Sequence, residues 1–219
     1  MPARIPEAPS RAERRKAWRE APLAAIDFET TGLDFAKDRI VSYGVVPIDG
    51  ADVRDDLARY DLVDPGPVPV SEVSRSIHGL GPDELAGASP AAAAREALRD
   101  LLGGRYLVTW NGIVEVSFLA MLFGTTDRRW SRRSVDVRWL VLAVLGPDGG
   151  ALTLSDAAAR FGVTVTTPHH ALDDALVTAR LFLAAGSELA ATGAIRSVRD
   201  VLRLGHARGA AARRPLVPR

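Results

Sequence analysis

The pattern of apolar and polar positions predicts strands in the first part of the chain. A short apolar run over 23–28 fits a buried strand and stops at Thr-Thr-Gly. Residues 39–48 contain several β-branched side chains and predict a second strand, and the Asp-Gly turn that follows favours a hairpin to a third strand over 53–63. Residues 64–70 then predict a Pro-rich loop, and residues 105–110 predict one more short strand.

The rest of the chain carries helix signals. Ser89 is expected as an N-cap with Pro90 at the first helical position, and Thr153 with Asp156 forms the pattern of a capping box. The helices predicted in this way follow Pro90 as far as Gly103, cover the apolar run around 118–123, and span 137–145, the segment after Asp156, 168–185 and 194–204. Strands followed mostly by helices, with one strand between them, predict an α/β domain in which helices pack against a mixed sheet.

Composition excludes several kinds of site. The chain has no cysteine, so disulfides, thiolate metal sites and cysteine nucleophiles are excluded. Its 219 residues favour one large domain with tails. No apolar run approaches the roughly 18 residues of a transmembrane helix, so no membrane partner is expected. Residues 1–20 lack the apolar core of a signal peptide, and a cytoplasmic location is expected.

Charge is distributed unevenly, although the formal net charge is only +1. Basic side chains crowd both ends of the chain: Arg4, Arg11, Arg14, Arg15, Lys16 and Arg19 in the first segment, and Arg203, Arg208, Arg213, Arg214 and Arg219 in the last. Basic ends can contact phosphates. Solvated and partly disordered tails are an equally good interpretation, so charge alone identifies no partner.

Two carboxylates stand at the end of the first predicted strand. Asp27 and Glu29 are two positions apart, and side chains two apart on a strand point to the same face. Adjacent carboxylates repel each other and raise each other's pKa unless a cation neutralises them. Mg²⁺ and Mn²⁺ are hard divalent cations that prefer such oxygen ligands. The pair therefore predicts either a metal site or a strand end whose acids simply meet water.

The segment TTPHHALDDALVTARLF, residues 166–182, brings two histidines and two aspartates to the start of a helix. Spacing alone pairs His170 with Asp174, which lie one helical turn apart. Acids in a first turn are also favoured by the helix dipole without any ligand. By itself this segment leaves both interpretations open.

Taken together, DFETTG at 27–32 and HHALDDA at 169–175 resemble the first and third motifs of the DnaQ-like (DEDDh) 3′–5′ exonucleases, in particular the proofreading epsilon-subunit type of DNA polymerase III. The third motif of that family reads His-x-Ala-Leu-x-Asp-Ala. The resemblance therefore selects His169 and Asp174 instead of the pair that spacing favours. Further ordered matches lie in 65–80, 134–142 and 154–163.

The second motif departs from the family pattern. The family usually has His-Asn-x-x-Phe-Asp-x-x-Phe-Leu, and the corresponding segment here is WNGIVEVSFL, residues 110–119. Trp110 replaces the histidine, and Glu115 stands where the family has an aspartate. A glutamate keeps the charge and the oxygens but is one methylene longer, which can retune or weaken a second metal site. A plain surface glutamate on a helix is the alternative.

The resemblance implies a ribonuclease H-like mixed β-sheet flanked by α-helices, and phosphodiester hydrolysis with two Mg²⁺ or Mn²⁺ ions. It implies that Asp27 bridges both ions, that Glu29 and Asp174 hold the first, and that Glu115 supports the second. His169 would be the general base that takes a proton from water. The implied contacts with the terminal nucleotide are Thr30, Thr31, Gly32, Leu33 and His78.

Four nearby residues have a structural interpretation. His170 and Asp173 are expected to face outward, and they are left out of the site. Asp136 is interpreted as a helix cap. His78 can also be a local turn or packing residue, because it stands immediately before a glycine.

The resemblance covers roughly residues 22–187, which predicts an exonuclease domain there, a basic N-terminal segment over 1–21, and a C-terminal helix with a basic tail over 188–219. It implies nucleic-acid 3′ ends as substrates, either single-stranded DNA or RNA with DNA favoured, and a polymerase or repair protein as the candidate partner. The altered segment at Glu115 supports a second hypothesis, a catalytically weakened module that binds nucleic acid or protein. In a third hypothesis, the acids and histidines are unrelated surface groups.

Overall fold

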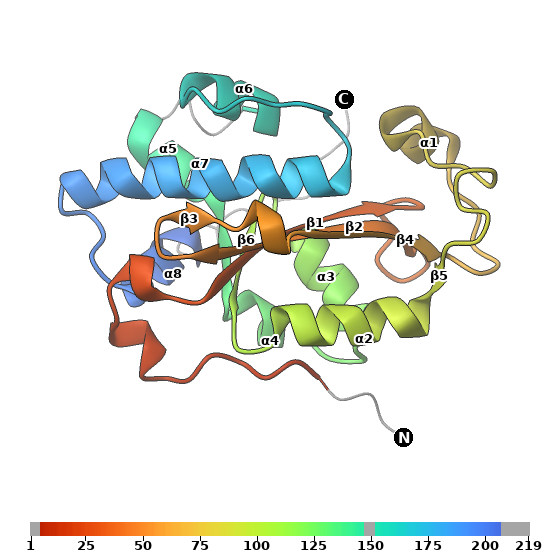
Figure 1. Cartoon of the computed structure of the whole chain (residues 1–219), viewed down its shortest axis with the longest axis horizontal. Coiled ribbons are helices and arrows are strands. Elements are labelled where there is room, and N and C mark those ends of the chain that lie inside the picture. Colours follow the sequence, from red (N-terminus) through yellow and green to blue (C-terminus); the bar gives the residue numbers. More distant parts are fainter. Residues whose placement is uncertain (1–4, 147–151, 207–219) are drawn as a thin grey trace.

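The computed structural model of the protein describes residues 5–146 and 152–206. Its centre is a seven-stranded sheet with helices on both faces (Figure 1). The strands are β1 Leu23–Thr30, β2 Ile40–Asp49, β3 Asp52–Val53, β4 Arg59–Asp64, β5 Ser89–Pro90, β6 Tyr106–Thr109 and β7 Ser134–Asp136. They lie in the order β5-β4-β2-β1-β6-β7, and β3 pairs with β2 outside this path.

The middle of the sheet is β1, whose two faces are both covered. It pairs antiparallel with β2 and parallel with β6, and the sheet continues antiparallel from β2 to β4 and parallel from β6 to β7. Seven of the eight residues of β1 are buried, which explains its near-continuous apolar run. The mixed sheet is confirmed, and β2 forms the predicted antiparallel hairpin. The third strand predicted over 53–63 is instead divided into β3 and β4 by a 3₁₀ turn at 55–57.

The helices are α1 Glu72–His78, α2 Ala91–Leu102, α3 Ile113–Leu122, α4 Asp127–Ser131, α5 Val137–Leu145, α6 Leu154–Arg160, α7 Ala171–Ala191 and α8 Val198–His206, and the short 3₁₀ helices are η1 Glu13–Arg15, η2 Trp18–Glu20 and η3 Asp55–Leu57. α7 crosses β1 and β2 on one face of the sheet together with α5 and α6, whereas α2, α3 and α4 lie on the other face (Figure 1). Within residues 5–146 and 152–206, no helix is long and apolar enough to cross a membrane.

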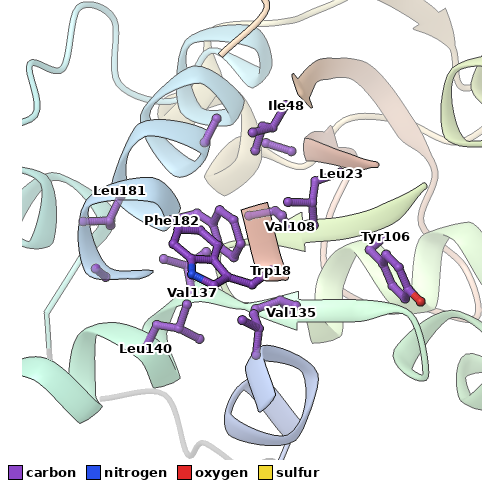
Figure 2. Close-up of a cluster of buried hydrophobic side chains, with 14 of the residues drawn as sticks. Trp18, Leu23, Ile48, Tyr106, Val108, Val135, Val137, Leu140, Leu181 and Phe182 are labelled. Carbon is purple, nitrogen blue, oxygen red and sulfur yellow. The ribbon is translucent and has the colours of Figure 1, made fainter. Parts of the chain in front are cut away.

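Two apolar cores hold these layers together, one on each face of the sheet. The core beneath α5 and α7 contains Trp18, whose ring lies edge-on against Phe182 with centroids 5.7 Å apart (Figure 2). Leu23 and Ala25 of β1 belong to this core, whereas the alternate residues of β1 pack against α2 and α3. Because side chains alternate along a strand, the next positions on the α7 face are Asp27 and Glu29.

Several element boundaries differ from the sequence predictions. Ser89 does not cap α2, because Ser89 and Pro90 form β5 beside β4 and Pro90 becomes the N-cap. α1, α4 and β7 were not predicted, and α7 begins and ends later than the range 168–185. The capping box of Thr153 and Asp156 is confirmed by reciprocal hydrogen bonds.

The segments before β1 and after α7 pack against each other. Ala17 and Ser197 form an isolated antiparallel bridge, and the Trp18 N–H donates to the Arg196 carbonyl at 3.1 Å. The division into one domain and two flanking segments stays a prediction. The basic residues Arg4, Arg208, Arg213, Arg214 and Arg219 lie outside the described residues.

Candidate active site

Asp27 and Glu29 lie near the end of β1, on the face that α7 covers. β6 pairs with β1 only as far as Ala25 and Val108, so the last part of β1 has no neighbouring strand on that side. A register shift after Glu29 also ends the regular pairing with β2. Strand pairing around β1 is therefore incomplete at this point, which leaves room for two carboxylates at the end of an otherwise buried strand.

Asp174 reaches the same place from the first turn of α7. This helix starts directly over β2 at Gly44, the residue that pairs with Asp27. A side chain at Gly44 would overlap the backbone carbonyl of Ala171, so the close approach of helix and strand requires a glycine. One carboxylate oxygen from each of Asp27, Glu29 and Asp174 lies within 4.8 Å of the others.

Glu115 approaches these acids from the first turn of α3. The residue is only 2% exposed, and its Oε2 has no hydrogen-bond partner among the described residues. After burial, its negative charge is the largest cause of the raised pKa of Asp27, which places Glu115 beside that carboxylate. It stands outside the group of three. Glu115 is thus buried at the site and is not a surface glutamate.

Burial and repulsion oppose the simultaneous ionisation of these four acids. Burial raises the pKa of Asp27 well above its usual value, and the charges of its three acidic neighbours raise it further. Burial, followed by the charge of Asp174, raises the pKa of Glu29 to about 8. Burial is also the main cause of the raised pKa values of Glu115 and Asp174. A set of oxygen donors with one buried, unpaired oxygen fits a hard divalent cation, which would remove the repulsion.

His169 lies in the turn before α7, and it is exposed. Its backbone adopts the left-handed conformation with a φ of 61°, and its N–H donates to Asp174 Oδ2 at 3.1 Å. The histidine that the resemblance selects is therefore joined to Asp174 through its backbone. It stands outside the helix, where a five-residue separation from the aspartate can be spanned.

His170, which is expected to face outward, is only partly exposed. It is the N-cap residue of α7, and its ring stacks on Tyr60 with centroids 4.4 Å apart and planes inclined by 25°. Asp173 Oδ2 lies 3.9 Å from its Nδ1. The interpretation of Asp136 as a cap is confirmed, because its carboxylate accepts the N–H of Arg138 in the first turn of α5 at 3.1 Å.

The segment that follows β1 is held in one shape by Asp38. Its carboxylate accepts hydrogen bonds from the Thr31 hydroxyl and from the Asp34 N–H, both at 2.7 Å. A side chain at Gly32 would collide with the same carboxylate. Thr31 is fully buried, whereas Leu33 is 68% exposed. Leu33 is therefore the residue of this segment that offers an apolar side chain to a ligand.

His78 ends α1 and joins this helix to β1. Its Nδ1 accepts the N–H of Leu80, which leaves the proton on Nε2 for donation to the Thr30 carbonyl, and both distances are 3.1 Å. Burial lowers the pKa of His78. The Thr30 hydroxyl donates to the Gly32 carbonyl at 2.8 Å. Because the backbone engages both ring nitrogens of His78, only the face of its ring is available to a ligand.

Three residues that pack at the site or against the start of α7 were not predicted from the sequence: Gly44, Asp38 and Tyr60. A glycine within the β-branched run of β2 is a signal of close backbone approach, so Gly44 could have been noticed. Tyr60 carries no local signal, because its partner His170 lies far along the chain. The partners of Asp38 precede it by four and seven residues, but the spacing belongs to no regular element.

Comparison with known proteins agrees with these motifs. The family model described as exonuclease, RNase_T, matches residues 24–182. The DNA polymerase III subunit epsilon of Treponema pallidum is 32% identical over 163 residues, which are 73% of this chain and 74% of that protein. The PolC-type DNA polymerase III of Thermotoga maritima is 29% identical over 168 residues, 75% of this chain. The match spans only 12% of that polymerase.

Among solved structures, E. coli Exonuclease I in complex with a dT13 oligonucleotide has a TM-score of 0.68 and 16% identity, over 79% of this chain and 42% of that chain. This likeness concerns the fold, and it confirms the ribonuclease H-like arrangement of a mixed sheet flanked by helices. The family match covers about three quarters of the chain and includes Asp27, Glu115 and Asp174. The chain therefore belongs to the exonuclease family, as its DnaQ-like motifs predict.

Proposed function

We propose that the protein is a metal-dependent 3′–5′ exonuclease that hydrolyses phosphodiester bonds at nucleic-acid 3′ ends. The observation that carries this proposal is the convergence of Asp27, Glu29 and Asp174, with the buried Glu115 beside them. Membership of the exonuclease family supports the reaction. The 3′–5′ direction rests on the DnaQ-like motifs.

The carboxylates are proposed to hold two Mg²⁺ or Mn²⁺ ions. Asp27 would contact both ions, Glu29 and Asp174 would hold the first, and Glu115 would support the second. When bound, such ions supply Lewis-acid chemistry, which activates a water and stabilises charge on the phosphate and the leaving oxygen. The chain contributes a fixed set of carboxylate oxygens, and their mutual repulsion favours the binding of a cation.

His169 is proposed as the general base. The residue is exposed and its backbone N–H donates to Asp174 Oδ2, so its imidazole would be close enough to the acid cluster to take the proton of an attacking water. A histidine suits this role because its ordinary pKa lies near neutrality. The N–H of the same residue orients the Asp174 carboxylate, so one turn supplies both a base and a fixed ligand.

Single-stranded DNA is the proposed substrate. The acids are flanked by exposed apolar side chains, Leu33 after β1 and Ile113 at the start of α3, which are 68% and 60% exposed. Apolar surfaces beside a phosphate site suit the faces of unpaired bases. We propose Thr30, Thr31, Gly32, Leu33 and His78 as the contacts with the terminal nucleotide. The Treponema pallidum relative is a DNA polymerase III subunit, which supports DNA over RNA and a polymerase or repair partner.

The proposal is tested with a 5′-labelled single strand, Mn²⁺ and then EDTA. We expect the wild-type chain to produce a ladder of shortened products that EDTA abolishes, because removal of nucleotides from the 3′ end leaves the label in place. Asp27→Asn and Asp174→Asn should each lower the rate by about a thousandfold or more. Glu188→Gln, an exposed acid on the same helix as Asp174, is the matched control and should cleave normally. An RNA strand of the same sequence should be cleaved more slowly.

Substitutions of Glu115 distinguish an active enzyme from the catalytically weakened binding module. Because its longer side chain is fully packed, we expect Glu115→Asp to lower the rate, since the shorter carboxylate withdraws from Asp27 and leaves a void. Glu115→Gln should lower it further. A large gain in Glu115→Asp would mark the natural site as degraded. Absence of cleavage by the wild-type chain, together with salt-sensitive binding of the strand, would favour the binding module.

A further inference from the structure

The contact between Tyr60 and His170 adjoins the site but has no part in the proposed chemistry. We propose that Tyr60 and His170 are positioning residues, which hold the His169 imidazole at the acid cluster by anchoring the turn that carries it. This inference rests on the proposed function, in which His169 is the general base.

Tyr60 offers a fixed platform on the correct face of the sheet. In the register of the sheet, Asp27 pairs with Gly44, and Gly44 pairs with Tyr60. Directly opposite residues of neighbouring strands point to the same face, so the Tyr60 ring rises on the face that carries Asp27. Gly44 between them has no side chain, and the start of α7 fills this space.

His170 is held by the stacking of its ring on Tyr60 and not by hydrogen bonds of that ring. The ring lies nearly parallel to Tyr60 at 4.4 Å, and its Nδ1 is buried with no hydrogen-bond partner among residues 5–146 and 152–206. As the N-cap residue, His170 makes no side-chain hydrogen bond to the first turn of α7. Serine, threonine, aspartate or asparagine would normally supply that bond. A position that breaks a local rule of helix stability is where a functional reason is expected.

The residue that needs anchoring is the neighbour of His170. His169 has a left-handed backbone, which is unfavourable for a residue with a side chain and persists only where its surroundings impose it. On the C-terminal side of His169, the Ala171 carbonyl packs against Gly44. His170, which lies between His169 and Ala171 in the chain, is held by its stack on Tyr60. Without the stack, the turn could relax and the exposed imidazole of His169 would leave its place.

The test compares Tyr60→Ala, Tyr60→Phe and His170→Ala by steady-state kinetics on the labelled strand with saturating Mn²⁺. We expect Tyr60→Ala and His170→Ala to lower kcat by about ten- to a hundredfold, because a small misplacement of a catalytic group is costly. KM and the Mn²⁺-induced rise in Tm should be retained, since the carboxylates remain. Tyr60→Phe keeps the ring and should keep kcat. Arg59→Ala, an exposed neighbour on the same strand, is the control.

The decisive arm repeats the substitutions in a His169→Ala background. If the stack acts through His169, Tyr60→Ala should cause no further loss of kcat there. An equal loss in both backgrounds would show a general structural role and overturn the inference. So would a Tyr60→Ala chain with wild-type kcat, or a Tyr60→Phe chain as slow as Tyr60→Ala. His170→Ala removes the stack at a helix end and serves if Tyr60→Ala fails to fold. A wild-type chain without Mn²⁺-dependent cleavage would instead refute the proposed function, and the inference with it.

Discussion

At the scale of the residue, Glu29 shows how the crowding of buried acids affects stability. Burial and the charge of Asp174 raise its pKa from 4.5 to about 8. A carboxyl group with a raised pKa binds its proton more tightly in the folded chain than in the unfolded chain. Its contribution to stability is therefore complete below the unfolded pKa and is lost as the pH rises toward the folded pKa.

We expect the metal-free protein to lose stability between about pH 5 and about pH 8, by about 4 kcal/mol, because this interval spans about three pH units at about 1.4 kcal/mol each. Thermal unfolding in EDTA across this range measures the loss. Asp174→Asn should flatten the pH dependence, because it removes the charge that, after burial, raises the pKa of Glu29. It should also diminish the Mn²⁺-induced rise in Tm. Glu96→Gln, an exposed acid on α2, should change neither quantity, and a stability that rises with pH in EDTA would contradict the expectation.

Some of the site could be predicted residue by residue from the sequence, and some could not. Asp27 and Glu29 share a face because strand geometry dictates it. Helix spacing favoured His170 as the neighbour of Asp174, and only the family resemblance selected His169. The physical reason is the left-handed turn at His169, which no local pattern announces because residues with side chains rarely adopt it.

At the scale of the element, the site depends on how closely α7 approaches β2. The first turn of the helix lies on Gly44, and this contact sets the height of Asp174 above Asp27. Any side chain at Gly44 meets backbone, which cannot swing aside as the end of a flexible side chain can. The geometry of the acids is therefore coupled to Gly44, which has no side chain of its own.

Gly44→Ala should destabilise the protein by about 2 kcal/mol, because overpacking forces a packed helix to move. It should also lower the cleavage rate by more than the lost folded fraction explains, since Asp174 moves with the helix. Urea unfolding and kinetics on the folded fraction separate the two effects. Gly81→Ala is the matched control, because a side chain there meets only the end of the Arg75 side chain. Wild-type stability in Gly44→Ala would show that the helix is not in contact with the strand.

Elements with a long or well-defined local pattern could be predicted from the sequence. Elements that are very short, or that form because they pair with a distant strand, could not. The apolar run of β1 was sufficient to predict a strand, and the capping box at Thr153 was sufficient to predict the start of a helix. α1 has a cap at Ser71 and a left-handed Gly79 at its end, but it is too short for apolar periodicity and follows a Pro-rich loop. β7 exists because it pairs with β6, which no local signal reveals. Likewise, Ser89 pairs with β4 and is unavailable as a helix cap.

At the scale of the whole molecule, the N-terminal flank contributes to the main core. Trp18 is 4% exposed and lies against Phe182 of α7 (Figure 2). Val201 of α8 belongs to the same cluster. Gly186 on α7 leaves room for the Trp18 ring, because a side chain there would lie 2.8 Å from it. The family resemblance begins near the start of β1, but the core extends across this boundary. We therefore expect the flank and the sheet to unfold together.

Trp18→Ala should lower the free energy of unfolding by about 3 to 5 kcal/mol, as is usual when a large aromatic ring is removed from a core. Urea unfolding followed by circular dichroism measures the loss, and Arg11→Ala, an exposed residue of the same segment, should have little effect. Because Trp18 belongs to the core at the Leu23 end of β1, away from the acids at the other end, kcat well below the unfolding midpoint should be nearly unchanged. A loss under about 0.5 kcal/mol, typical of a surface substitution, would mean that the flank is only loosely attached to the sheet.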